Sequence, residues 1–145
     1  MDILICLVIT FLILIFCIKS IINSFKPLKI DLQPNFVSGN KNHNEITKIQ
    51  KGKCILKFEN GKFFIIQNEN ILEELSEDIY NIRVWKFKNS LYMAIRMKTH
   101  SEYMFQLAEN SENNKYVIAI MYKMAKYIAN KLKVEFKDCG ESEEE

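Results

Sequence analysis

The residues best suited to chemistry are four carboxylates, Glu73, Glu74, Glu77 and Asp78. Carboxylates held close together can share a proton in acid–base catalysis or bind a divalent cation. Apolar residues between them recur at the spacing of one helix face, which predicts a helix over 70–80 with the acids on its other side. Because acids on such a helix are most often a solvated face, we assign them no catalytic or metal-binding role.

Four other side chains have the right types for a zinc site or a nucleophile, namely His43, His100, Cys54 and Cys139. Zinc sites space their ligands in short pairs such as Cys-x-x-Cys, and no such pair occurs. The four glycines fit neither common phosphate-binding loop, and no nucleophile–histidine–acid set has a supporting spacing. We therefore predict no catalytic, cofactor-binding or metal-binding residues, no cofactor, and a protein that is not an enzyme.

An apolar, uncharged stretch covers residues 3–18. It extends over Ile3–Ile22 if Lys19 reaches with its aliphatic stem and lifts its ammonium group to the lipid headgroups. Twenty helical residues span about 30 Å, the thickness of a bilayer's hydrocarbon core. A retained anchor, a cleaved signal peptide and a buried helix all fit this pattern. An acidic start at Asp2 and the lack of a small-residue cleavage site favour the anchor.

Charge indicates which side of the membrane the rest of the chain occupies. Lys19, Lys26 and Lys29 follow the apolar stretch, whereas Asp2 offsets the amino terminus before it. Positive flanks tend to stay cytoplasmic, so a cytoplasmic domain is slightly favoured. On that side Cys54 and Cys139 stay reduced, whereas on the outer side they are able to form a bridge.

Residues 53–67 predict a β-hairpin with a two-residue turn at Asn60-Gly61 and with Glu59 opposite Lys62. A second hairpin is expected over 82–98, turning near Asn89-Ser90, and a further strand over 103–108. An apolar stripe predicts a helix over 111–133 that Ser111 caps, with lysines on its other side. Within a proline-containing linker, residues 28–32 alternate like a short strand.

These elements predict an α+β protein: a transmembrane anchor over 1–22, a polar linker over 23–52, a domain over 53–138 and an acidic tail over 139–145. The domain is expected to combine an antiparallel sheet of two hairpins and a fifth strand with two amphipathic helices. The function that fits best is a single-pass, non-enzymatic interaction subunit of a membrane-associated protein complex. Its expected partners are the lipid bilayer, through Ile3–Ile22, and membrane-associated proteins, with no nucleic acid. The alternative is an outward-facing component of a virion or cell-surface entry or attachment complex.

Overall fold

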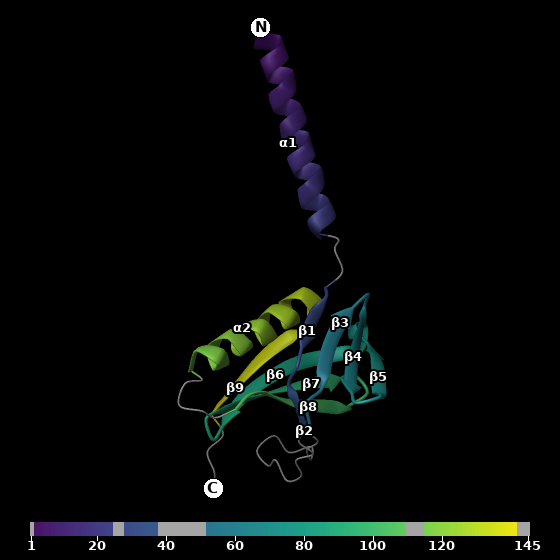
Figure 1. The fold of residues 1–145 in the computed structure, drawn as a ribbon, viewed down its shortest axis with the longest axis vertical. Helices are drawn as coiled ribbons and strands as arrows, with labels where there is room; N and C mark the ends of the chain where they lie inside the picture. Colours follow the sequence, from purple (N-terminus) through teal and green to yellow (C-terminus); the bar gives the residue numbers. More distant parts are fainter. Residues whose placement is uncertain (1, 25–27, 38–51, 110–114, 142–145) are drawn as a thin grey trace.

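The computed structural model describes residues 2–24, 28–37, 52–109 and 115–141. A long helix, α1, comes first, and two β-sheets and a second long helix, α2, form a domain after it (Figure 1). An N-terminal apolar helix followed by a mostly antiparallel sheet domain and a later helix is an α+β architecture. Ser111 and His43, both used in the sequence predictions, lie outside the described residues.

Helix α1 runs over Asp2–Ser24 and contains the apolar segment Ile3–Ile22, none of which is buried against the rest of the chain. Its polar residue Thr10 donates hydrogen bonds to the carbonyl oxygens of Cys6 and Leu7, at 3.0 and 2.9 Å. The hydroxyl is therefore satisfied within the helix. This helix is long and apolar enough to cross a membrane, a property that signal sequences share.

Two sheets make up most of the domain. Sheet A has four antiparallel strands in the order β1 (Ile30–Leu32), β3 (Ile55–Glu59), β4 (Lys62–Gln67) and β5 (Asn70–Leu75). Sheet B has the order β2 (Asn35–Val37), β8 (Glu102–Ala108), β7 (Ser90–Met97), β6 (Ile79–Phe87) and β9 (Glu135–Glu141). The 3₁₀ helix η1 (Ser76–Asp78) leads from sheet A to sheet B. Helix α2 (Lys115–Leu132) crosses over so that β9 runs parallel to β6.

Tight turns with positive φ angles set the strand register. Asn60 and Gly61 have φ of 54° and 73°, and they place Glu59 opposite Lys62 as a two-residue turn requires. The β6–β7 turn has the same character but lies at Lys88-Asn89, one residue before the predicted position. The domain contains more hairpins than the two that the sequence predicts, because β4 and β5 also pair directly.

The predicted helix over 70–80 is wrong. These residues form β5, η1 and the start of β6 instead. A turn at Asn68, whose φ is 55°, reverses the chain so that Ile71 pairs with Ile66 and Leu72 with Ile65. Pairing with β4 satisfies backbone donors and acceptors of this segment, so hairpin formation overrides a helical spacing of apolar residues.

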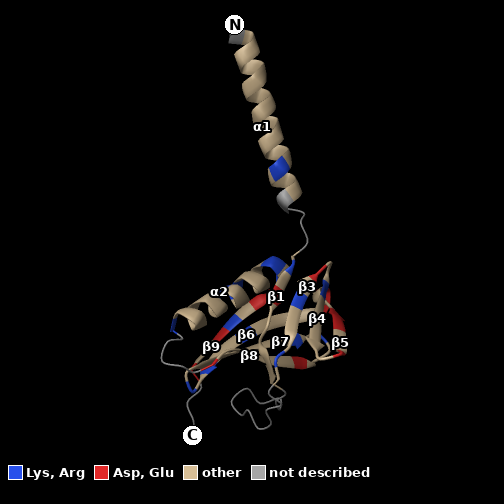
Figure 2. Cartoon of the chain, viewed as in Figure 1, with Lys and Arg blue, Asp and Glu red and all other residues tan. Residues whose placement is uncertain are grey.

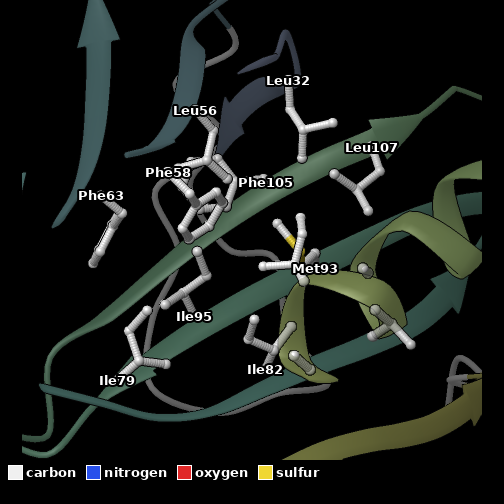
Figure 3. Packing of buried hydrophobic residues seen from close by; sticks show 14 of the residues in the cluster. Leu32, Leu56, Phe58, Phe63, Ile79, Ile82, Met93, Ile95, Phe105 and Leu107 are labelled. Atoms are coloured by element: carbon white, nitrogen blue, oxygen red, sulfur yellow. The ribbon is translucent and has the colours of Figure 1, made fainter. Parts of the chain in front are cut away.

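One hydrophobic core lies between the two sheets and beneath α2. Figure 3 shows Leu56, Phe58 and Phe63 of sheet A pointing toward Met93 and Phe105 of sheet B. Helix α2 contributes its fully buried residues to this same core, namely Ala125, Ile128 and Ala129. Sheet A and α2 therefore cover the same face of sheet B. The small side chains of Ala125 and Ala129 face this core.

The sheets extend beyond the range 53–138. The stretch interpreted as a linker, 23–52, supplies β1 and β2, and residues 139–141 of the expected tail end β9. Leu32 and Val37, in β1 and β2, are both buried. The chain passes from sheet A to sheet B at Pro34, whose carbonyl oxygen accepts the backbone N–H of Cys54 at 3.0 Å.

Candidate protein-interaction surface

The outer face of sheet A, opposite the core, carries an apolar row across three strands. Ile55 of β3 pairs with Ile66 of β4, and Ile66 pairs with Ile71 of β5, so the three side chains lie side by side. Ile71 is 66 % exposed and Ile55 is 38 % exposed. Leu75, at the far end of β5, is also exposed. We call this set, Ile55, Ile66, Ile71 and Leu75, the outer row.

Charged residues border the three isoleucines of the outer row and separate them from Leu75 on sheet A. Lys57 and Glu59 form an ion pair at 2.5 Å, and Lys62 pairs with Glu73 across β4 and β5. The hydrogen bond and charge of Lys57 lower the pKa of Glu59, and those of Glu59 raise the pKa of Lys57. An exposed apolar centre with a rim of solvated charges is the usual anatomy of a protein-binding surface.

The four carboxylates singled out in the sequence do not form a cluster. Glu73 and Glu74 are neighbours in a strand, so they point to opposite faces of sheet A. Glu73 reaches Lys62, whereas Glu74 accepts a hydrogen bond from the Tyr103 hydroxyl at 2.7 Å. Within the described residues, no three histidine, cysteine or acidic side chains gather as a metal site would require.

Cys54 and Cys139 lie on opposite faces of sheet B. Cys54 belongs to the core, where its thiol donates to the Pro34 carbonyl oxygen at 3.4 Å and burial raises its pKa to about 11. Asp138 points toward α2, because it accepts the Tyr122 hydroxyl, so the next residue in β9, Cys139, points the other way. Both thiols are free. The bridge that an outward-facing domain would allow between them is not formed in this structure.

His100, another candidate from the sequence, is exposed in the turn between β7 and β8. It adopts a φ of 68°, in the left-handed region where asparagine, aspartate and histidine are enriched among residues other than glycine. The turn brings none of the cysteines to it: Cys54 lies in the core and Cys139 in β9. These positions give no support to a zinc site built from His100 and the two cysteines.

A polar and aromatic cluster lies on the face of sheet B away from the core. Trp85 and Tyr92 stack there at 5.7 Å, and both are buried. Arg83 forms an ion pair with Glu102 beside them. The burial of Arg83 has no signal in the sequence, because arginine as a residue type favours the surface.

Helix α2 exposes a second set of apolar side chains on the side away from the core. Tyr116 is 83 % exposed, and Val117, Ile120 and Tyr127 are also exposed. The ammonium group of Lys131 lies 5.7 Å from the Tyr127 ring centroid, close enough for a cation–π contact. The sequence predicted lysines on this side, and the structure adds the aromatic residues between them.

The chain matches no family model and no curated protein sequence. Its own geometry therefore carries the functional argument. Among the described residues, the arrangement offers exposed apolar surfaces with charged rims, which are suited to binding another macromolecule. The outer row and β5 form the most organised of these surfaces, because strand register fixes each residue's position.

Proposed function

We propose that this protein is a single-pass, membrane-anchored and non-enzymatic interaction subunit of a membrane-associated protein complex. The observation that carries the proposal is the complete exposure of the apolar segment Ile3–Ile22. A helix that is hydrophobic on all sides needs an apolar environment, and the described domain supplies none to α1. A lipid bilayer supplies one along the whole length of such a helix.

The sheet domain supports the second part of the proposal, the role as an interaction subunit. Its core is complete, since sheet A, sheet B and α2 bury one continuous set of apolar side chains. The outer row is therefore surplus to the folding of the domain, and Ile71 and Leu75 remain exposed after the core has formed. Exposed apolar residues gathered on one face support binding to another protein.

We propose that the domain lies on the cytoplasmic side of the membrane. Lys19 lies near the C-terminal end of the apolar segment Ile3–Ile22, and Lys29 follows before β1 begins. Cations that flank a transmembrane helix favour the cytoplasmic side. The cysteines offer no separate evidence on this point, because the geometry of Cys54 and Cys139 is the same on either side of a membrane.

Membrane extraction tests the anchor. Carbonate treatment of cell membranes should leave the full-length chain in the pellet, with Ile3–Ile22 still present by mass spectrometry. A variant with Ile9→Lys and Leu12→Lys should appear in the supernatant, because each charge in the middle of the helix costs about 3 kcal/mol on insertion. The matched control Ile9→Val and Leu12→Val should stay in the pellet. Release of the unmodified chain, or a mature chain that begins after Ile22, contradicts the proposal.

The exposed thiol of Cys139 reports the side of the membrane. In a chain with Cys6→Ala and Cys17→Ala, an impermeant maleimide should label Cys139 only after the cells are opened. Cys139→Ser should remove that label. Labelling in intact cells contradicts the cytoplasmic orientation and favours the outward-facing alternative.

A further inference from the structure

Strand β5 ends sheet A with an unpaired edge. It pairs with β4 on one side, and no described strand pairs with it on the other. In antiparallel pairing, every second residue turns its backbone N–H and C=O groups away from the neighbouring strand. Counting from the two-residue turn at Asn68-Glu69, these outward-facing residues are Ile71, Glu73 and Leu75. They form a template on which an additional strand can pair.

Charge is the protection that β5 gives this edge, through Glu73 and Glu74. Edge strands are usually kept from pairing by charged side chains, especially lysine, by proline, by a bulge or by great shortness. β5 has six residues, regular pairing with β4, no proline and no lysine. It also exposes apolar side chains on both of its faces, because Leu72 and Ile71 are both exposed.

Charge decides which strand can pair there. Between Lys62 and Arg83 the chain has five acids and no base. The acids are Glu69, Glu73, Glu74, Glu77 and Asp78. Figure 2 shows acidic residues along β5, at the outer edge of the sheet. A second copy of β5 would bring its own Glu73 and Glu74, with Glu69, Glu77 and Asp78 beside them, against these acids. Like charges opposite each other destabilise a strand pair.

We propose that β5 accepts an extended segment of a partner protein as a fifth strand of sheet A, and that this segment alternates apolar residues with lysine or arginine. The apolar residues of the segment extend the outer row beyond Ile71 and Leu75. Its cations form ion pairs with acids that flank β5, such as Glu69 and Glu77. Backbone pairing supplies affinity, and the alternation of side chains supplies specificity, as in other cases of strand addition. This inference rests on the proposed function and names the chemistry of the partner.

The attachment of β5 to the rest of the domain supports this role. Glu74 is held by Tyr103 of β8, and Glu73 by Lys62 of β4. The strand is therefore fixed to both sheets before a partner arrives. A rigid edge loses little conformational entropy on binding, which favours affinity.

Two synthetic peptides test the proposal on the full chain in zwitterionic micelles. One alternates valine with lysine, and the other alternates valine with glutamate. Saturating lysine peptide should slow amide hydrogen exchange at Ile71, Glu73 and Leu75 by about tenfold or more, because these groups become paired. The glutamate peptide should leave their exchange unchanged. Equal protection by both peptides, or none by either at millimolar concentration, overturns the proposal.

Charge reversal on the protein provides the second arm. The double variant Glu69→Lys and Glu77→Lys should weaken binding of the lysine peptide by about fivefold, because exposed charge pairs are individually weak and both are reversed. The matched control reverses Glu135 and Glu141 on β9, the edge of the other sheet, and should leave binding unchanged. Trp85 fluorescence checks that both variants fold. Equal weakening by both variants overturns the proposal, because it indicates a non-specific charge effect.

Protection of β5 that grows with the concentration of the chain alone would identify a second copy as the occupant, which also contradicts the proposal. These measurements do not depend on whether α1 crosses a membrane. A chain that is released by carbonate but binds the lysine peptide at β5 overturns the anchor and keeps the strand-addition site. A chain that is retained in the pellet but binds neither peptide keeps the anchor and overturns the strand-addition site.

Discussion

The hydroxyl of Tyr103 in β8 donates a hydrogen bond to the carboxylate of Glu74 in β5, and the two oxygens are 2.7 Å apart. This contact joins sheet B to the edge strand of sheet A. The ring of Tyr103 also packs edge-on against Phe63 of β4, at a centroid distance of 5.9 Å. One tyrosine therefore connects the position of β5 to the core.

Removing this hydroxyl should loosen the edge strand. Tyr103→Phe keeps the ring contact and leaves the Glu74 carboxylate without its donor, so we expect the unfolding free energy to fall by about 1 kcal/mol. The matched control is Tyr80→Phe on β6, where the exposed hydroxyl has no described partner and the change should be neutral. Chemical denaturation of the full chain in micelles measures both. Equal stability of the two variants contradicts the role given to Tyr103.

The same contact sets a response to alkaline pH. Burial, and then the hydrogen bond to Glu74, raise the pKa of Tyr103 from 10.0 to about 12. Because the folded state holds this proton more tightly than the unfolded state, the stabilisation is complete below pH 10 and is lost between pH 10 and about 12. Glu74→Gln should lower the pKa of Tyr103 while burial keeps it above 10. The difference in tyrosinate absorbance between chains with and without Tyr103→Phe reports the titration of Tyr103 alone. A Tyr103 pKa that Glu74→Gln leaves unchanged would contradict the role of this hydrogen bond.

The turn between β3 and β4 depends on a glycine. Gly61 has a φ of 73°, and a Cβ atom added there meets no other atom within 4 Å. A cost of substitution must therefore come from the backbone conformation and not from a clash. Gly61→Val should lower the unfolding free energy by about 1 kcal/mol or more, whereas Asn60→Gly, which tolerates positive φ, should change it by less. Thermal melts measure the melting temperatures of both variants. An unchanged melting temperature for Gly61→Val would show that the turn accommodates valine without strain.

The two domain cysteines should react very differently. With Cys6→Ala and Cys17→Ala in place, a maleimide at pH 8 should modify exposed Cys139 within minutes. Cys54 should react only on unfolding, because it is buried and its pKa of about 11 leaves little thiolate at that pH. Mass spectrometry of the labelled chain counts the modified thiols. Under oxidising conditions we expect no intramolecular bridge, and a mobility shift that Cys139→Ser abolishes would contradict the opposite-face geometry.

The parts of the fold that the sequence predicts well are those with a local cause. The apolar run that forms α1, the Asn60-Gly61 turn and the apolar stripe of α2 each depend on residues close together in the chain. β8 is predicted by the same reasoning. These elements are enough to define the α+β class and the position of the first hairpin.

The errors arise where pairing between strands decides. Ile71 and Leu72 fit a helix by spacing, and only pairing with β4 makes the segment a strand. β9 has no local signal, because its exposed, charged residues resemble a tail until β6 lies beside them. The outer row is equally hidden in the sequence. The alternation of Ile55 and Ile66 is visible there, but only the pairing of β4 with β5 places Ile71 beside them.

The five residues between Ser24 and Ile30 limit how far the domain can travel. A fully extended chain covers at most about 3.5 Å per residue, so β1 begins no more than about 20 Å from the end of α1. A domain of this size is roughly 35 Å across. With α1 in a bilayer, the whole domain is confined to a layer about 55 Å deep along the membrane surface. A domain anchored in this way searches its surroundings in two dimensions, and under our proposal any strand that pairs with β5 must be presented inside this layer.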